Sequence, residues 1–177
     1  MATILGIDSG ATGALAFIND KGSLLNCYDM PFVDKFKIKH VDVFDLFNII
    51  MKNEPDYIYL EEVKGIRGMS TMQTAFVQGG HYHPVGCAVY SYLVAKNMED
   101  DDFRLVTPQV WKRALNVQGG DTGKKKYKTI DMVKSIYSSQ KALYTGSRGG
   151  IKDGRTDAIA IALYGLKDLK RKGFVGD

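Results

Sequence analysis

The chain has 177 residues, of which 45% are hydrophobic and 25% are charged. This composition is ordinary for a water-soluble protein, and the length allows one domain with a sizeable core. The two cysteines, Cys27 and Cys87, are too few for a disulfide framework or a zinc ribbon, which favours a reducing compartment. The sequence shows neither a signal peptide nor an apolar run of membrane-spanning length. We therefore expect one cytoplasmic domain over residues 1–177 that is neither secreted nor bound to a membrane.

The net charge of +4 is distributed unevenly along the chain. Residues 1–103 contain 8 lysines and arginines against 14 acidic residues, whereas residues 104–177 contain 16 against 6. A basic C-terminal half favours a polyanionic partner such as nucleic acid, although a solvated helical surface gives the same pattern.

Short apolar runs predict five β-strands, of which the first three lie close together in the sequence. The Asn-Asp-Lys-Gly sequence at residues 19–22 separates the second run from the third and is typical of a hairpin turn. The expected strands cover residues 3–7, 13–18, 24–30, 57–60 and 103–106. We expect the first three to form an antiparallel meander within a mixed sheet.

Helical spacing of apolar residues predicts α-helices between and after these strands. Thr107 and Pro108 are typical of an N-cap and a first helical turn, and Gly79 with Gly80 is expected to end a short helix. The other expected helices cover residues 41–51, 71–77, 84–97, 127–137 and 153–169, and the expected loops cover residues 116–126 and 138–152. This order predicts an α/β protein with helices on both faces of a five-stranded mixed sheet.

Four carboxylates stand at the ends of apolar segments, where acids contribute little to folding. Asp8 and Glu61 follow expected strands, and Asp153 and Asp157 lie at the start of the last expected helix. Oxygen ligands of this kind suit a hard divalent cation such as Mg²⁺. Paired ions of that type cleave phosphodiesters by holding the attacking and leaving oxygens. The pattern therefore points to nuclease chemistry.

The choice of carboxylates within this set is partly open. Glu61 is followed by Glu62, and strand alternation puts the two side chains on opposite faces. Only one of them can join Asp8, but in a sheet covered on both faces alternation does not choose between them. Asp153 and Asp157 are four residues apart and share a helix face, with Asp153 also suited to cap the helix. The apolar run after Asp157 predicts that its carboxylate is buried and needs a partner or a metal.

Basic residues lie between the acidic elements, several of them in Gly-rich segments suited to phosphate contacts. A solubilising role is the alternative for such lysines. The residues that we expect to contact nucleic acid are Lys112, Lys124, Lys125, Lys126, Lys128, Arg148, Lys152 and Arg155.

Two further features carry weaker signals. His81, His83 and Cys87 are three loosely spaced ligands without a fourth, which is weak support for a soft metal site. Trp111 is the only tryptophan, and its apolar helical neighbours favour a core position over a base-stacking platform.

Four motifs follow one another along nearly the whole chain. They are GIDSGATGALAF at residues 6–17, LEEV at 60–63, VTPQVWKRAL at 106–115 and DGRTDAIAIALYG at 153–165. In this order they resemble the RuvC-like Holliday junction resolvases of the RNase H-like superfamily, particularly the phage and viral branch. The resemblance aligns Glu61 with the catalytic glutamate. One departure is the four-residue spacing of the last two acids, which is usually three in bacterial members.

The resemblance implies an RNase H-like fold, a homodimer and magnesium-dependent cutting of branched DNA, especially four-way junctions, in DNA recombination and repair. It implies that two Mg²⁺ ions, for which Mn²⁺ is expected to substitute, are held by Asp8, Glu61, Asp153 and Asp157. Lys112 or a lysine of residues 124–128 is expected to stabilise the charged transition state.

Two other classes of protein stay open at this point. The sequence GIDSGATGA also suits the first phosphate loop of an actin-like ATPase or a sugar kinase. That fold needs a duplicated domain and a second Gly-rich Asp loop, and this sequence contains neither. A junction-binding protein without catalytic activity is the other class, and only a cleavage assay separates it from a nuclease.

Overall fold

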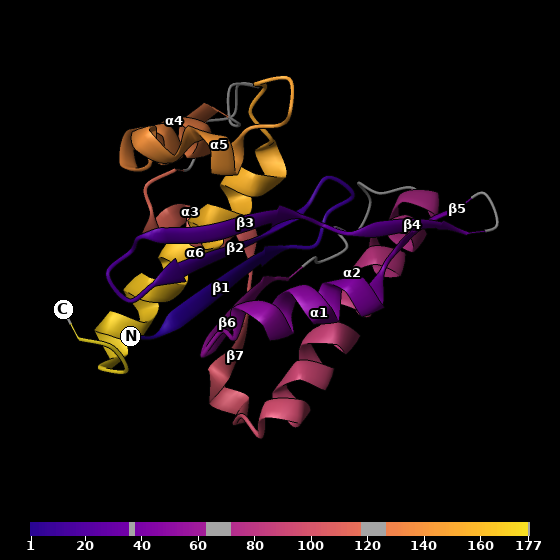
Figure 1. Ribbon diagram of the computed structural model, residues 1–177, viewed down its shortest axis with the longest axis horizontal. Coiled ribbons are helices and arrows are strands. Elements are labelled where there is room, and N and C mark those ends of the chain that lie inside the picture. The colour runs from indigo at the N-terminus through magenta and orange to yellow at the C-terminus, as the bar shows by residue number, and fades with distance from the viewer. Residues whose placement is uncertain (36–37, 63–71, 118–126, 177) are drawn as a thin grey trace.

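The computed structural model describes residues 1–35, 38–62, 72–117 and 127–176, and its centre is a mixed five-stranded sheet (Figure 1). The strand order is β3-β2-β1-β6-β7. Antiparallel pairing joins β1 to β2 and β2 to β3, while β1 with β6 and β6 with β7 pair in parallel. The strands are β1 (Thr3–Asp8), β2 (Ala14–Asn19), β3 (Leu24–Asp29), β6 (Tyr57–Glu61) and β7 (Phe103–Val106). The five predicted strands and the antiparallel meander are confirmed.

The predicted hairpin turn joins β2 to β3. Its Asn19 side-chain oxygen accepts hydrogen bonds from the backbone N–H groups of Lys21 and Ser23, at 3.0 and 2.8 Å. Gly22 has a φ of +79°, a conformation that favours glycine. The turn residues therefore set the start of β3.

Helices cover both faces of the sheet, as predicted, and each face has its own core (Figure 1). Strand alternation sends Ile4, Ala16 and Tyr59 toward the first core, which contains the buried residues of α6. The intervening Leu5 and Ile58 point into the second core, beneath α1 and α2. The main helices are α1 (Val43–Asn53), α2 (Met72–Lys96), α3 (Pro108–Ala114), α4 (Tyr127–Ile136) and α6 (Asp153–Lys172).

The helix α6 packs directly on β1 at Gly6. A methyl group added to Gly6 would lie 2.3 Å from the Ala158 carbonyl oxygen and 2.4 Å from the Ala162 backbone nitrogen. Further toward its N-terminus, Gly154 lies against the Thr12 carbonyl in the loop after β1, where an added methyl group would be at 1.8 Å. These contacts hold the N-terminal half of α6 over the ends of the central strands.

The segment before α1 differs from the sequence prediction. The helix begins at Val43 rather than at residue 41, because Asp42 is the N-cap and accepts a hydrogen bond from the Asp45 N–H at 3.0 Å. Val41 instead ends β5 (Ile38–Val41), which pairs antiparallel with β4 (Phe32–Lys35) in a separate two-stranded sheet. Four-residue strands give little period-two signal, so this hairpin was not predicted.

A single helix α2 replaces the two helices predicted around Gly79 and Gly80. It runs through both glycines and through Pro84. Its later residues Val85 and Val89 are fully buried against the sheet, and this packing outweighs the local preferences of glycine and proline for ending a helix. Residue 71, where the first of the two helices was predicted to begin, lies outside the described residues.

The predicted loop at residues 138–152 contains two short helical segments, η2 (Ser138–Gln140) and α5 (Lys141–Tyr144), and a bridge from Thr145 to Ile151. Tyr144 is buried in the first core, which explains why a polar sequence is ordered here. The other predicted loop, at residues 116–126, is described only as far as Val117.

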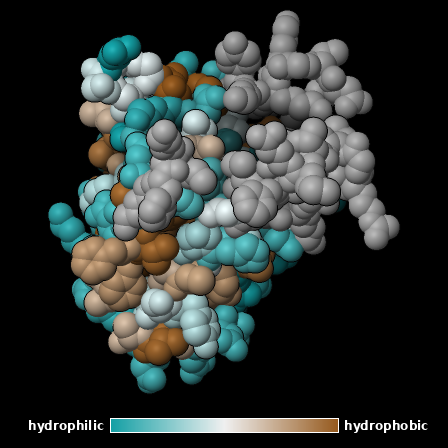
Figure 2. Space-filling view, turned by 90° about the vertical axis from the view of Figure 1, so that its right-hand side faces the viewer, coloured by the Kyte–Doolittle hydropathy of each residue, from teal (hydrophilic) through white to brown (hydrophobic). Residues whose placement is uncertain are grey.

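One side of the molecule carries apolar patches among hydrophilic residues, the largest in the lower part of Figure 2. Exposed apolar side chains on this chain include Phe44 on α1 and Tyr90 and Val94 on α2. None of the helices in the described part of the chain combines the length and apolar character needed to cross a membrane.

We expect Gly6→Ala to destabilise the fold by about 1–3 kcal/mol or more, because the added methyl group would overlap the α6 backbone. Gly86→Ala is the control, since nothing lies within 4 Å of the methyl group added there in α2. That change should stabilise the protein by up to about 1 kcal/mol. Urea unfolding of both variants measures the difference. Similar effects in the two would contradict the close packing of α6 on β1.

Candidate active site

Asp8 and Glu61 are the last residues of two neighbouring strands. Because β1 and β6 are parallel, with Ile7 opposite Leu60, both strands end at the same edge of the sheet. Both side chains also share the face that α6 covers, since Gly6 and Tyr59, two residues earlier, contact that helix. Strand alternation left open whether Glu61 or Glu62 lies beside Asp8. The position of α6 shows that it is Glu61.

Glu62 lies on the other face of the sheet. Its backbone N–H donates to the Val106 carbonyl at 2.8 Å, which continues the pairing of β6 with β7. The pKa of Tyr82, on α2, is raised mainly by burial and secondly by the negative charge of Glu62. Glu62 therefore faces α2 rather than the acidic group around Asp8.

Glu61 is half-buried and stands among other carboxylates. Burial is the largest cause that raises the pKa of Glu61 to about 7, followed by the negative charges of Asp8 and Asp157. A hydrogen bond from the Trp111 indole nitrogen to Oε1, at 3.0 Å, and the positive charge of Lys112 act in the opposite direction. The folded protein without a cation therefore disfavours the charged form of Glu61.

Asp8 has a similar environment. Burial raises the pKa of its carboxyl group, against the lowering effects of a hydrogen bond from the Gly10 N–H and of the Lys112 charge. The Gly10 bond to Oδ1 is 2.9 Å long and fixes the carboxylate against the loop that follows β1. Asp8 and Glu61 are therefore two adjacent acids with raised pKa values, and the charge of Lys112 acts on both.

Asp157 joins this pair from α6, since its charge acts on Glu61. The prediction that its carboxylate is buried is wrong, because Asp157 is only half-buried. The apolar residues that follow it, from Ala158 onward, are the ones covered by the sheet. Asp157 itself stands at the edge where the strands end.

Asp153 occupies a different position, one turn earlier on α6. It is the first residue of the helix rather than the N-cap, which is Lys152. It borders a cavity of about 500 Å³ between the loop after β1 and the start of the β4–β5 hairpin, lined in part by Thr12, Phe32 and Lys39. The structure thus gathers Asp8, Glu61 and Asp157. Asp153 lies one turn before Asp157 on α6 and borders this cavity.

The donor chemistry of this group fits a hard divalent cation. Among the residues that the structure describes, no three histidines, cysteines or acids form a ready-made cage for a metal ion. Mg²⁺ does not require one, because it commonly takes one or two carboxylates and completes its shell with water and substrate phosphate. Two adjacent acids with raised pKa values, Asp8 and Glu61, offer oxygen ligands whose repulsion such a cation would relieve.

The helix α3 brings Trp111 and Lys112 to the site. Thr107 is the N-cap and Pro108 the first helical residue, as predicted, so α3 turns back directly after β7. Trp111 is fully buried, which confirms the predicted core position, and the Lys112 ammonium lies 4.9 Å from its ring centroid. The bond from Trp111 to Glu61 was missed. The need of a buried indole N–H for an acceptor was the available signal.

The predicted DNA-contacting residues fall into three groups. Lys124, Lys125 and Lys126 lie outside the described residues, as does the side chain of Lys128, whose backbone belongs to α4. Arg148 is exposed and Lys112 adjoins the carboxylates. Lys152 and Arg155 form ion pairs within the molecule.

Asp29, at the end of β3, is the partner of Lys152 and Arg155 and holds the first turn of α6 in place. It accepts hydrogen bonds from Lys152 and from Arg155 Nε, the latter at 2.7 Å. Burial acts to raise the pKa of Asp29, but the bonds from Arg155 and Lys152 outweigh it and leave the pKa below its ordinary value. Arg155 also donates to the Leu143 carbonyl at 3.0 Å. Sequence reasoning missed Asp29, and nothing local in the sequence signals a partner 126 positions away.

The weak soft-metal candidate on α2 does not assemble in the described part of the chain. His81 is buried with its ring 5.3 Å from that of Phe32, whereas His83 and Cys87 are exposed. Aromatic packing accounts for His81.

No protein-family model matches the chain, and no curated protein matches it. Solved structures do match. RuvC of Thermus thermophilus in complex with a Holliday junction substrate has a TM-score of 0.62 and 17% identity, over 99% of this chain and 98% of that one. RuvC of the same organism in a second structure gives 0.60 and 18%, over 98% of both chains. The yeast mitochondrial Holliday junction resolvase Ydc2 gives 0.55 and 17%, over 98% of this chain and 86% of that one.

These similarities define the class of fold as RNase H-like. Within that class, the chain has the fold of the RuvC Holliday junction resolvases over nearly its whole length. The fold that the four sequence motifs implied is thus confirmed.

The raised pKa of Glu61 predicts a pH effect on stability without divalent cations. The pKa is about 7 in the folded protein against an ordinary 4.5, so the protonated form stabilises the fold. That contribution is complete below the ordinary pKa and is lost as the pH rises toward 7. The melting temperature of Glu61→Gln relative to wild type should therefore increase from about pH 5 to about pH 7.5. The prediction would be contradicted if the difference in melting temperature between Glu61→Gln and wild type did not vary with pH. It would also be contradicted if the Glu62→Gln control showed the same variation.

Proposed function

We propose that this protein is a structure-specific endonuclease that resolves four-way DNA junctions and other branched DNA by metal-dependent hydrolysis of phosphodiester bonds. One observation carries the proposal. Asp8 and Glu61 lie side by side at the ends of two central parallel strands, with Asp157 and Lys112 acting on Glu61, in a chain that has the RuvC fold.

The carboxylates would hold the metal ions in this scheme. Asp8 and Glu61 would bind from the strands, and Asp157 and Asp153 from α6. Two bound Mg²⁺ or Mn²⁺ ions would supply activation of water and stabilisation of the departing 3′ oxygen. The Gly10 N–H orients Asp8, and the Trp111 N–H orients Glu61. Lys112, whose positive charge already acts on both acids, would also stabilise negative charge on the phosphate in the transition state.

Basic residues around the site would bind the DNA backbone. Phosphate contacts fix the position of DNA without reading its sequence, which suits recognition of a branched shape. The proposed contacts are Lys112, Lys124, Lys125, Lys126, Lys128, Arg148, Lys152 and Arg155. Of these, Lys152 and Arg155 also bind Asp29, so they would contribute to the positive field while anchoring α6.

A homodimer of this single domain, residues 1–177, would place two sites on one junction with matching two-fold symmetry. The exposed Tyr90 and Val94 on α2 offer apolar surface for a contact between subunits. The phage and viral branch and a cytoplasmic location stay predictions from the sequence.

The direct test is cleavage of a synthetic four-way junction, with a linear duplex of the same sequence as the control. We expect wild type to cut the junction only when Mg²⁺ is present. Asp8→Asn should abolish cutting but keep binding in a gel-shift assay, because the basic residues are untouched. Binding without cutting by wild type would identify a junction-binding protein instead. ATP hydrolysis without either would point to the actin-like class.

Salt dependence tests the proposed basic contacts. A plot of log affinity against log salt concentration has a negative slope. Each lysine that no longer neutralises a phosphate of a duplex arm should reduce the magnitude of that slope by about 0.9. Replacing Lys124, Lys125, Lys126 and Lys128 with alanine should therefore flatten the slope, as measured by fluorescence anisotropy in buffers without Mg²⁺. If the slope equals that of wild type, these lysines do not bind the DNA.

A further inference from the structure

We propose that Trp111 is a positioning residue, whose indole N–H holds one oxygen of Glu61 so that the other is presented to a divalent cation shared with Asp8. This inference rests on the proposed function, because it assigns a role within the same site. The observation behind it is the hydrogen bond of 3.0 Å from Trp111 Nε1 to Glu61 Oε1.

The fold leaves the indole few alternatives. Glu61 is paired with Val106 in the sheet, so the strand that leads into α3 runs beside the end of β6. The Thr107–Pro108 helix start then places Trp111 one turn into α3, fully buried and next to Glu61. An indole N–H is a single donor with no acceptor capacity, so in a buried position it needs one fixed partner. Glu61 Oε1 is that partner.

The consequence is a carboxylate with one oxygen committed. A glutamate at a strand end can otherwise turn about its last side-chain bond, which is only weakly restricted. With Oε1 held by Trp111, Oε2 is the oxygen left for a cation. Hydrogen bonds of this kind orient metal-binding side chains and commonly affect metal affinity strongly. The neighbouring Lys112 adds positive charge on the same side, so one short helix carries both effects.

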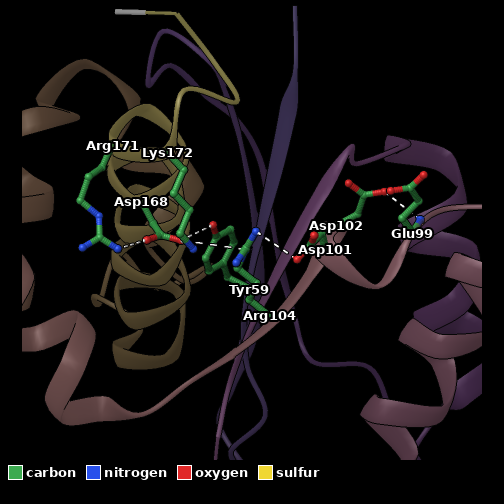
Figure 3. A network of polar contacts seen from close by, with 8 residues as sticks. All are labelled: Tyr59, Glu99, Asp101, Asp102, Arg104, Asp168, Arg171 and Lys172. Carbon is green, nitrogen blue, oxygen red and sulfur yellow. Dashed lines mark hydrogen bonds and ion pairs between the residues drawn. The ribbon is translucent and has the colours of Figure 1, made fainter.

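A second aromatic–carboxylate pair on β6 provides an internal comparison (Figure 3). Tyr59, two residues before Glu61 on the same face, donates from its hydroxyl group to Asp168 Oδ2 at 3.0 Å. Asp168 also accepts from Arg171 and Lys172, at 2.8 and 2.7 Å. It lies 11 residues beyond Asp157 on α6, about 16 Å along the helix axis.

The two pairs differ in the charges around them. Cations surround Asp168, so its negative charge is compensated within the protein (Figure 3). Glu61 instead faces Asp8 and Asp157, and the positive charge of Lys112 acts against theirs. An aromatic donor therefore has two different settings. Tyr59 donates to a carboxylate that is already compensated, whereas Trp111 donates to one of a group of carboxylates that suits an added cation.

The first test uses the sole tryptophan of the chain, which gives a single indole N–H signal in a ¹⁵N-correlated NMR spectrum. We expect Glu61→Gln to move that signal and Tyr59→Phe to leave it in place. Titration of wild type with Mg²⁺ should shift the signal, and Asp8→Asn should suppress the shift. A signal that ignores Glu61→Gln, or a wild-type signal that Mg²⁺ does not move, would overturn the inference. This test needs neither DNA nor a substitution of Trp111.

The second test compares Trp111→Phe with Tyr59→Phe in junction cleavage. Loss of the indole donor should raise the Mg²⁺ concentration for half-maximal cutting by roughly 10–100-fold. Tyr59→Phe also removes an aromatic donor to a carboxylate but should keep the wild-type Mg²⁺ requirement. A folded Trp111→Phe with that wild-type requirement would overturn the positioning role and leave the proposed function intact. Wild type that cuts no junction would overturn the proposed function, while the NMR titration would still show whether Mg²⁺ reaches Glu61.

Discussion

The close approach of α6 to the central strand at Gly6 is the constraint on which the arrangement of the site depends. Since Gly6 has no side chain, the α6 backbone can lie against β1, and the helix then extends past the strand ends. That extension brings Asp157 to Glu61 and Asp8. The position of α6 also marks the face of the sheet on which Asp8 and Glu61 lie, and Glu62 lies on the opposite face. A helix held farther away would leave the strand acids and the helix acid apart.

Charge is distributed unevenly along the face that α6 covers. At one end, Asp168 is compensated by Arg171, Lys172 and the hydroxyl group of Tyr59, so that burial is outweighed and its pKa stays below the ordinary value. At the other end, burial raises the pKa values of Asp8 and Glu61. Folding alone would favour compensation at both ends. Retention of clustered acids at the strand ends is typical of a functional site, and a divalent cation is the simplest group that would balance them.

Local patterns in the sequence were sufficient for the five strands and for acids at the ends of β1 and β6, because period-two apolar runs and turn residues are short-range signals. They could not decide between Glu61 and Glu62, since both faces of the sheet are covered. Contacts between distant residues were also out of reach. Trp111 meets Glu61 across 50 positions, and such pairs have no local signature. The apolar neighbours of Asp157 suggested that it is buried, but its place at the strand ends leaves it half-buried.

The proposed catalysis takes place on the α6 face of the sheet. Glu61 and Glu62 allow a test of this location, because they are adjacent and chemically identical but lie on opposite faces of the sheet. Glu61 faces Asp8, and Glu62 faces α2. The decisive measurement is the rate of four-way junction cleavage in Mg²⁺ by Glu61→Gln and by Glu62→Gln, each compared with wild type. We expect loss of cleavage in the first variant and near-normal cleavage in the second. Greater damage from Glu62→Gln would contradict the proposed location and move the site to the opposite face.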